Sequence, residues 1–417
     1  MRKKHIISSI LFFIIVLMPA LAAAKIYIDI TSPERRVPIA ISPLAGLSGG
    51  EISSVVKDDL DATGLFVFLD EKGFTESPTQ PFNRNNWLST SVVCVLKGKV
   101  NFSPDGQLEA VASLYDVQTG GALFTKRYNA PVEMLRPLAH AIASDVYTEL
   151  TGSKTSPFRS RLSFIVEHKG IKDMEIADWD GKRARPLGFK ERMLMPPRWS
   201  RDGETLYYSA SRGMGWKIYS ISLKSMKEKL VFAKPGTGIM GDVDAAGDIV
   251  FSSSFQGSPN IYVLKPGGTL QRLTKSYGID VSPAYSPDGR RIAYVSDREG
   301  TPQIYIMDAG GYNSARISFS GNYNTSPSWS PDGERIVFAG RYQGLNQIFT
   351  VKADGSDPMM LTSAGDNEDP CFSPDGSMIA FTSKRDGRRA VYIMRANGEG
   401  QKRITPPGVV AYGPKWH

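Results

Sequence analysis

Short segments of alternating apolar and polar side chains recur through the C-terminal two thirds of the chain. At 291–296, Ile292 and Tyr294 fall on one side and Ala293 and Val295 on the other, as in a β-strand that is covered on both faces. The segment follows Ser-Pro-Ala-Tyr-Ser-Pro-Asp-Gly at 282–289 and precedes another apolar run at 303–308, and the same succession returns from 326 and from 369. The pattern predicts one β-rich unit that is repeated.

The repeat has a regular period. Its first aromatic residue falls at Trp199, Tyr285, Trp329, Phe372 and Trp416, spacings of 43 or 44 residues with one double spacing of 86. The double spacing predicts a degenerate copy near 242, where 241–247 carries Val243 in place of the aromatic residue. A period of this length in short strands is typical of the blades of a β-propeller.

Each unit contains four predicted strands, with the Ser-Pro-Asp-Gly turn between the first and the second. Second strands begin near residues 162, 205, 248, 291, 335 and 378, which predicts six blades. The first strands are out of phase, because the first blade has none upstream and the segment Pro414-Lys-Trp416 is left over at the end. We therefore expect a closed ring in which the C-terminal strand completes the first blade and removes the open sheet edges.

The first 152 residues follow another pattern. Residues 1–24 are typical of a secretory signal peptide, with basic residues, an apolar run and Ala22-Ala-Ala24 as a cleavage site, so we expect an exported protein. An uncleaved anchor helix is the less favoured alternative. Residues 25–152 predict a small α+β domain with strands at 25–30, 37–41, 65–69, 92–102, 108–117 and 122–128, and helices after Ser48 and Pro131. Residues 153–160 form the expected linker, and 161–417 the all-β six-bladed propeller.

Composition excludes some functions. The net charge of +8 includes three basic residues of the signal, and no long basic run is present, so nucleic acid is not an expected partner. Cys94 and Cys371 fall in different predicted domains, and we expect both to be buried free thiols. No metal-ligand spacing of His and Cys and no convergent nucleophile, base and acid are visible, which predicts neither a cofactor nor an enzyme.

Three short motifs have a functional and a structural interpretation. Gly-Leu-Ser-Gly-Gly at 46–50 matches the nucleophile elbow G-x-S-x-G, with His140 as the one base available, but Ser48 and Glu51 also have the spacing of a helix capping box, which we favour. Residues 236–241 match G-x-G-x-x-G but precede no helix, which excludes a nucleotide loop. The acidic segment 366–369 offers oxygen ligands for a cation, although a solvated loop is the favoured interpretation.

The order of these parts resembles the TolB family of the Tol–Pal envelope system. A signal peptide, a small α+β domain and repeats of Pro-x-aromatic-Ser-Pro-Asp-Gly closed by a terminal Pro-x-Trp cover essentially the whole mature chain. The degenerate third unit and Ser200-Arg-Asp-Gly203, which lacks the proline, depart from the pattern without changing the blade count. The resemblance implies a non-enzymatic periplasmic adaptor that binds the lipoprotein Pal at one propeller mouth and TolA through its mature N-terminus, and that supports outer-membrane integrity and constriction during division.

Propeller topology predicts which mouth takes part. Connections into the first strands share one end of the ring with the loops between second and third strands, and apolar and acidic residues alternate there. The expected Pal-binding rim consists of Met195, Met240, Asp280, Val281, Asn324, Thr325, Glu368, Asp369 and Tyr412. A rim of loops that merely stays soluble is the alternative.

The expected TolA-binding segment is the new N-terminus left by signal cleavage. It comprises Lys25, Ile26, Tyr27, Ile28, Asp29, Ile30 and Thr31. Its alternating side chains suit pairing with a sheet edge, so the segment either switches between its own domain and a partner or is a permanent edge strand.

Two other classes of protein compete with the adaptor. A propeller that carries a hydrolase or lyase site would need a titratable cluster in one cleft, and a glycan-binding propeller would carry exposed aromatic residues at equivalent loop positions, whereas Tyr277, Tyr323 and Tyr412 are scattered. A cation in the propeller channel remains an open alternative to a channel without a metal. We expect a monomer that is attached to the envelope only through its partners.

Overall fold

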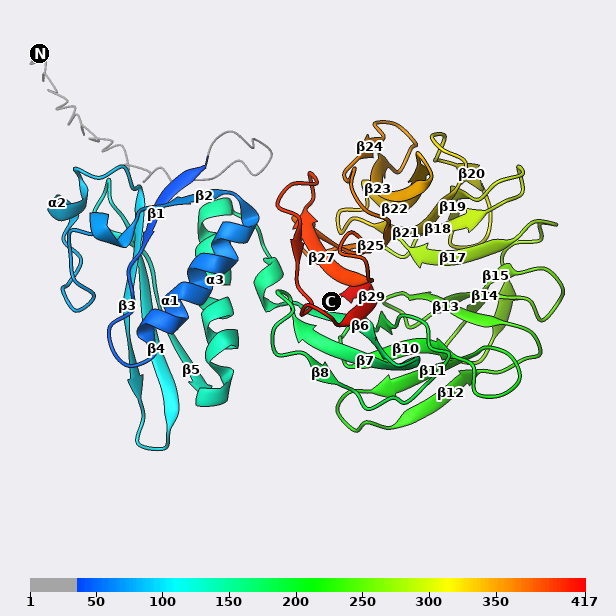
Figure 1. The fold of residues 1–417 in the computed structure, drawn as a ribbon, viewed down its shortest axis with the longest axis horizontal. Helices are drawn as coiled ribbons and strands as arrows, with labels where there is room; N and C mark the ends of the chain where they lie inside the picture. Colours follow the sequence, from blue (N-terminus) through cyan, green and yellow to red (C-terminus); the bar gives the residue numbers. More distant parts are fainter. Residues whose placement is uncertain (1–35) are drawn as a thin grey trace, which may run out of the picture.

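The computed structural model describes residues 36–417 and shows an N-terminal α+β domain joined to a ring of β-sheets (Figure 1). The expected fold class is therefore confirmed, including the number of blades. The expected signal peptide at 1–24 and the expected strand at 25–30 lie outside the described residues. Among the described residues, no helix has the length and apolar character that crossing a membrane requires.

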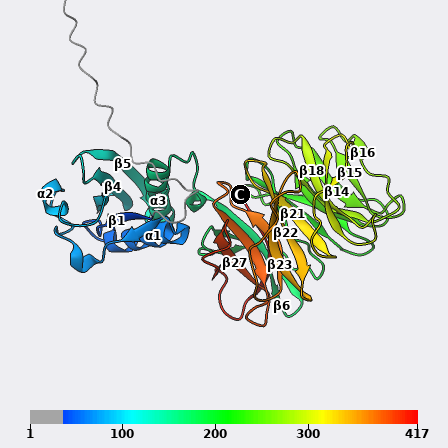
Figure 2. The ribbon, with the colours of Figure 1, turned by 90° about the horizontal axis from the view of Figure 1, so that it is seen from above.

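The N-terminal domain is a five-stranded sheet with two helices on one face (Figures 1 and 2). Its order is β2(Phe66–Phe68), β1(Val37–Ile41), β3(Cys94–Phe102), β4(Gln107–Asp116) and β5(Ala122–Pro131). The strand β1 runs parallel to β2 and β3, and the β3–β4–β5 meander is antiparallel. The helices α1(Gly49–Thr63) and α3(Leu135–Thr151) bury their apolar stripes against this sheet, as their 3.6-residue period predicts.

The start of α1 differs from the prediction. Ser48 adopts φ 65° and its side chain makes no capping hydrogen bond, so the expected capping box is wrong. The reason is the tight approach of the chain: a Cβ on Gly49 would lie 1.8 Å from the carbonyl oxygen of Leu44. The left-handed conformation of Ser48 leads the chain into the helix, and the Ser48 side chain does not cap it. Nearby, the hydroxyl of Ser53 accepts a hydrogen bond from the N–H of Leu44.

Short elements complete the domain and lead to the ring. They are η1(Glu71–Gly73), α2(Arg84–Trp87), η2(Val132–Met134) and η3(Pro157–Arg159). The segment around α2 carries Trp87, whose buried ring contacts Phe74 in a second small core beneath β1. In η3, Phe158 is buried between Tyr147 of α3 and Trp179 of the first blade, with ring centroids 5.6 and 5.4 Å away. The expected linker region thus contributes to packing between the domains.

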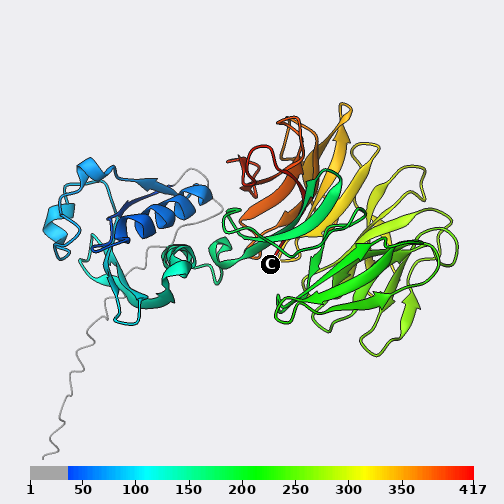
Figure 3. The same cartoon turned by 60° about the horizontal axis from the view of Figure 1, so that its bottom comes forward.

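The propeller consists of six four-stranded antiparallel sheets arranged around an axis (Figures 1 and 3). The first blade contains β6(Arg161–His168), β7(Ile171–Asp178) and β8(Arg185–Pro186). The second blade contains β9(Arg198–Trp199), β10(Thr205–Ala210), β11(Lys217–Ser222) and β12(Glu228–Phe232). The third blade contains β13(Gly238–Val243), β14(Ile249–Ser253), β15(Asn260–Leu264) and β16(Leu270–Arg272). The remaining blades are β17(Asp280–Tyr285), β18(Arg291–Ser296), β19(Gln303–Asp308), β20(Ala315–Arg316); β21(Asn324–Trp329), β22(Arg335–Tyr342), β23(Leu345–Lys352), β24(Met359–Met360); and β25(Asn367–Phe372), β26(Met378–Ser383), β27(Ala390–Arg395), β28(Lys402–Arg403).

The C-terminal strand closes the ring. The strand β29(Val410–Trp416) pairs antiparallel with β6, so the first blade has the order β29-β6-β7-β8. Two backbone hydrogen bonds of 2.7 and 2.9 Å join Arg161 and His417, and the indole of Trp416 donates to the hydroxyl of Ser160. The out-of-phase count of first and second strands predicted this closure correctly.

Removal of residues 413–417 tests how much the closure stabilises the ring. The truncated protein loses the pairing of Lys415 and Trp416 with β6 and both hydrogen bonds between Arg161 and His417. This part of the edge of β6 is then exposed, so we expect the melting temperature to fall by about 10 °C or more. Differential scanning calorimetry measures the change. The matched control is Trp416→Phe, which keeps the strand and should cost far less. An unchanged melting temperature in the truncated protein would show that β29 does not stabilise the ring.

Candidate functional site: the channel and the two ends of the propeller

The two ends of the ring are built from different connections. The turns between first and second strands and the hairpins between third and fourth strands lie at one end, which we call the turn face. Loops between second and third strands and the connections into the next blade lie at the other end, the connection face. The N-terminal domain contacts the turn face: the phenol of Tyr147 lies 3.5 Å from Asp375 in a Ser-Pro-Asp-Gly turn, and Arg395 donates to the carbonyl of Ala62.

Five of the six first strands contain a bulge, and the two-residue strand β9 is the exception. Pairing shifts register between Val281 and Ala284 in β17, and equivalent shifts occur in β13, β21, β25 and β29. Ser282, Ser326 and Asp369 take φ values between 52° and 55° at these bulges, a conformation that costs free energy for residues other than glycine. The bulge redirects the strand so that the residue before each aromatic side chain faces the axis.

Six such residues, one from each blade, line a cavity of about 400 Å³ in the channel toward the turn face. They are Arg198, Asp242, Ala284, Ser328, Cys371 and Lys415. The prolines of the Ser-Pro-Asp-Gly turns and the side chains of Trp199, Trp329 and His417 form the rest of its wall.

The cavity is electrostatically unbalanced. Burial, with Arg198 close by, lowers the pKa of Lys415 to about 8. Burial also lowers the pKa of Arg198 and raises the pKa of Asp242, and the carboxylates of Asp242 and Asp369 partly offset the two cations. Two cationic side chains beside these acids make the wall a poor cation site.

The cavity carries no reactive thiol. Burial raises the pKa of Cys371, whose sulfur donates to the carbonyl of Pro414 at 3.3 Å. A thiol with a raised pKa is a weak nucleophile. Cys94 is also buried and free, as expected from the sequence.

The expected rim residues lie at the starts of the first strands, toward the connection face, but they differ in accessibility. Met240, Asp280, Asn324 and Tyr412 are buried, whereas Met195, Val281, Thr325, Glu368 and Asp369 are partly exposed. The buried polar members support the blades: Asn324 donates to Gln303 at 2.7 Å and to the carbonyl of Ser320 at 2.8 Å. Asp280 accepts from the hydroxyl of Ser276 and pairs with Arg298 at 3.2 Å.

The exposed part of this face is apolar to a degree that the sequence analysis missed. Large apolar or aromatic side chains are solvent-exposed in its loops and connections at Ile171, Met193, Met214, Tyr277, Ile279, Phe319, Tyr323, Tyr342 and Leu345. They come from the second-to-third-strand loops of three blades and from three of the connections between blades. Apolar residues within polar loops were the sequence signal for this surface. The expected rim, however, included only positions next to the strands.

Charged side chains lie among these apolar groups. Lys384 pairs with Asp366 at 2.5 Å and with Glu368 at 3.5 Å, and Arg389 pairs with Glu368 at 3.4 Å. The acidic segment 366–369 is therefore bound by cationic side chains, and it enters β25 from Asn367 onward, so it is not a solvated loop. Arg389 also lies over the ring of Tyr412, 5.1 Å from its centroid.

Neither sequence motif develops into a catalytic site. His140, the base considered for the G-x-S-x-G segment, is buried with its Nδ1 2.6 Å from Asp59. Burial raises the pKa of that aspartate to about 6. The G-x-G-x-x-G segment at 236–241 runs into β13, and no helix follows it.

The amine of Lys415, a half-buried residue that lines the channel cavity, gives a pH-dependent contribution to stability. Its pKa is about 8 in the folded protein and near 10.4 in an unfolded chain, so between these values the unfolded state binds more protons and stability rises with pH. Lys415→Met should remove this rise, a difference of about 2 to 3 kcal/mol between the two proteins from pH 7 to pH 10.5. Urea unfolding across this pH range measures it. The exposed control is Lys402→Met, and equal pH profiles for wild type and Lys415→Met would contradict the burial effect.

Comparison with known proteins agrees with this architecture. The TolB β-propeller domain model matches residues 147–417 and the TolB amino-terminal domain model matches residues 26–123. A TolB homolog from Chlorobium luteolum is 33% identical over 285 residues, 66% of this chain and 63% of that protein. The Tol-Pal system protein TolB from Bordetella pertussis is 26% identical over 296 residues, 70% of this chain and 67% of that protein.

Solved structures give the same result. The crystal structure of TolB from Acinetobacter baumannii superposes with a TM-score of 0.82 at 25% identity, covering 92% of this chain and 97% of that chain. The likeness therefore includes both domains. With one family model covering well over half of its residues, this chain belongs to the TolB family.

Proposed function

We propose that this protein is a non-enzymatic adaptor of the Tol–Pal system in the periplasm. It binds the lipoprotein Pal at the connection face and TolA through its mature N-terminus, and so supports outer-membrane integrity and envelope constriction during division. The Tol-Pal name of the Bordetella relative and the two-domain likeness to TolB support the choice of system. The residue compositions of the channel and the connection face support the choice of a binding protein over an enzyme.

One observation carries the assignment of the Pal-binding face: exposed apolar side chains gather at the connection face, away from the N-terminal domain. Tyr323, Ile279 and Met214 are 41%, 47% and 95% exposed. Such groups are unfavourable in water and are the typical anchors of a protein interface, with paired charges such as Glu368 and Arg389 as its polar surroundings. The opposite end is partly covered by the N-terminal domain, which leaves less free surface there.

The proposed TolA contact follows from the sequence of 25–31. Its alternating side chains suit addition to a sheet edge through backbone hydrogen bonds, a common mode of peptide recognition. If Pal binding favours the form in which this segment is docked on its own protein, it weakens TolA binding, and linkage requires the reverse effect as well. A permanent edge strand is the competing arrangement.

Substitutions at the connection face test the Pal site. Ile279→Asp and Thr325→Lys each place a charge in the proposed apolar contact, so we expect at least a tenfold loss of Pal affinity by isothermal titration calorimetry. Tyr312→Asp is the matched control, because Tyr312 is 72% exposed in a third-to-fourth-strand hairpin at the turn face. Circular dichroism checks that each variant is folded. Unchanged Pal affinity in both connection-face variants would place the site elsewhere.

Deletion of residues 25–31 from the mature protein tests the TolA contact. We expect TolA binding to be lost and Pal binding to be kept, because the segment supplies the strand that TolA pairs with. Titration of the deletion variant with each partner measures both affinities, and Pal binding serves as the internal control for folding. Full TolA affinity in the trimmed protein would leave the segment with a structural role only.

A further inference from the structure

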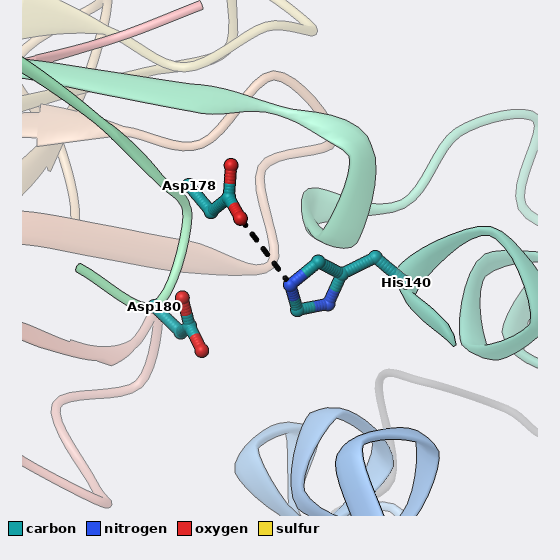
Figure 4. Close-up of side chains that lie close together, drawn as sticks. All are labelled: His140, Asp178 and Asp180. Atoms are coloured by element: carbon teal, nitrogen blue, oxygen red, sulfur yellow. Dashed lines mark ion pairs between the residues drawn. The ribbon is translucent and has the colours of Figure 1, made fainter. Parts of the chain in front are cut away.

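The interface between the two domains contains a buried histidine that faces two carboxylates. His140 lies on α3 of the N-terminal domain, and Asp178 and Asp180 lie at the end of β7 and in the hairpin that follows it in the first blade (Figure 4). One ligand atom from each of the three side chains falls within 4.8 Å of the other two. His140 is 2% exposed, and the two aspartates are largely covered.

The two facing atoms lack hydrogen-bond partners among the described residues. The Nε2 of His140 and the Oδ2 of Asp178 are both buried without a partner, and they lie 3.8 Å apart, too far for a hydrogen bond. An unsatisfied buried polar atom costs free energy, and here two such atoms point toward the same space. That arrangement is expected where a bound group normally lies between them.

The other ring nitrogen of His140 is already held as metal-binding histidines are held. Its Nδ1 lies 2.6 Å from the carboxylate of Asp59 on α1, which fixes the ring so that the lone pair of Nε2 points at Asp178 and Asp180. A carboxylate behind the histidine makes the ring a better ligand and is typical of zinc sites. Asp59 therefore has the position of the supporting carboxylate in a metal site. A histidine with a purely structural role has no special need of such a carboxylate.

We propose that His140, Asp178 and Asp180 bind one zinc-like divalent cation that joins the N-terminal domain to the first blade. Histidine nitrogen and carboxylate oxygen are zinc ligands at about 2.0 to 2.2 Å, and a water molecule completes the usual set of four. In a tetrahedral set with bonds of about 2.1 Å, neighbouring ligand atoms are about 3.4 Å apart, so binding requires the three side chains, whose ligand atoms now lie within 4.8 Å of one another, to close by roughly 1 Å. The inference is independent of the proposed partners Pal and TolA.

Two guanidinium groups beside the carboxylates set the conditions for binding. Arg136 pairs with Asp180 at 2.5 Å, and Arg183 lies 3.7 Å from Asp178. The other oxygen of Asp180 accepts the N–H of Lys182 at 3.0 Å, so a metal ion would share Asp180 with these donors. Asp59, Asp178 and Asp180 together outnumber the two arginines. The zinc ion would therefore neutralise an excess of negative charge.

Titration with zinc chloride tests the proposal on the mature protein without added histidines. We expect one equivalent to bind by calorimetry and to raise the melting temperature as its concentration increases. Asp178→Asn should weaken binding by at least tenfold, and Asp59→Asn by 10- to 100-fold through loss of the supporting carboxylate. Cobalt chloride in place of zinc provides an absorption spectrum that reports histidine and oxygen ligands directly.

Two controls make the outcome decisive. His168→Gln removes an exposed histidine in the same blade and should leave binding unchanged, whereas His140→Gln should abolish it. If His140→Gln fails to fold, Asp178→Asn with the cobalt spectrum answers the same question. Absence of zinc uptake, or equal affinity in wild type and Asp178→Asn, would overturn the proposal and leave His140 with a structural role as the hydrogen-bond partner of Asp59.

Discussion

Pairing of β29 with β6 is the interaction on which the rest of the structure depends. It joins the last residues of the chain to the first strand of the ring, so each blade has two neighbours and no sheet edge at the seam is left open. The same strand places Lys415 and Trp416 beside Arg198 and Trp199, where the indole of Trp199 donates to the carbonyl of Lys415. Closure therefore builds part of the channel wall as well as completing a blade.

The period of the repeat made the closure of the ring predictable from the sequence. Turn residues and alternating strands are local features, so the sequence indicated six blades, their phase and the seam before any tertiary contact was known. Burial was harder to predict, because Asp280 and Asn324 are polar residues at strand starts that form internal hydrogen bonds with Arg298 and Gln303 rather than facing a partner. Arg298 lies in the loop between β18 and β19, and Gln303 lies on β19 in the blade before that of Asn324, so spacing along the chain does not reveal these partners.

The prediction of a capping box at Ser48 was wrong for a related reason. Capping-box spacing is a local signal, whereas the backbone there is set by how closely Gly49 approaches Leu44. The His140 cluster was beyond sequence reasoning altogether, since its members come from α1, α3 and the first blade and are separated by up to 121 residues, from Asp59 to Asp180. Only the docking of two domains brings them together.

The two ends of the ring thus have different surfaces. The connection face offers exposed apolar groups with paired charges, which suits a protein partner that must also dissociate. The turn face is engaged with the N-terminal domain through Arg395, Tyr147 and the His140 cluster. A signal from a partner at the connection face would have to cross the blades, and the bulges at Ser282, Ser326 and Asp369 are the positions where the first strands hold strained backbone between the two ends. Coupling between the connection face and the N-terminal domain through these bulges requires that each bulge can take two arrangements. If partner binding left the bulges unchanged, this route would transmit no signal to the N-terminal domain.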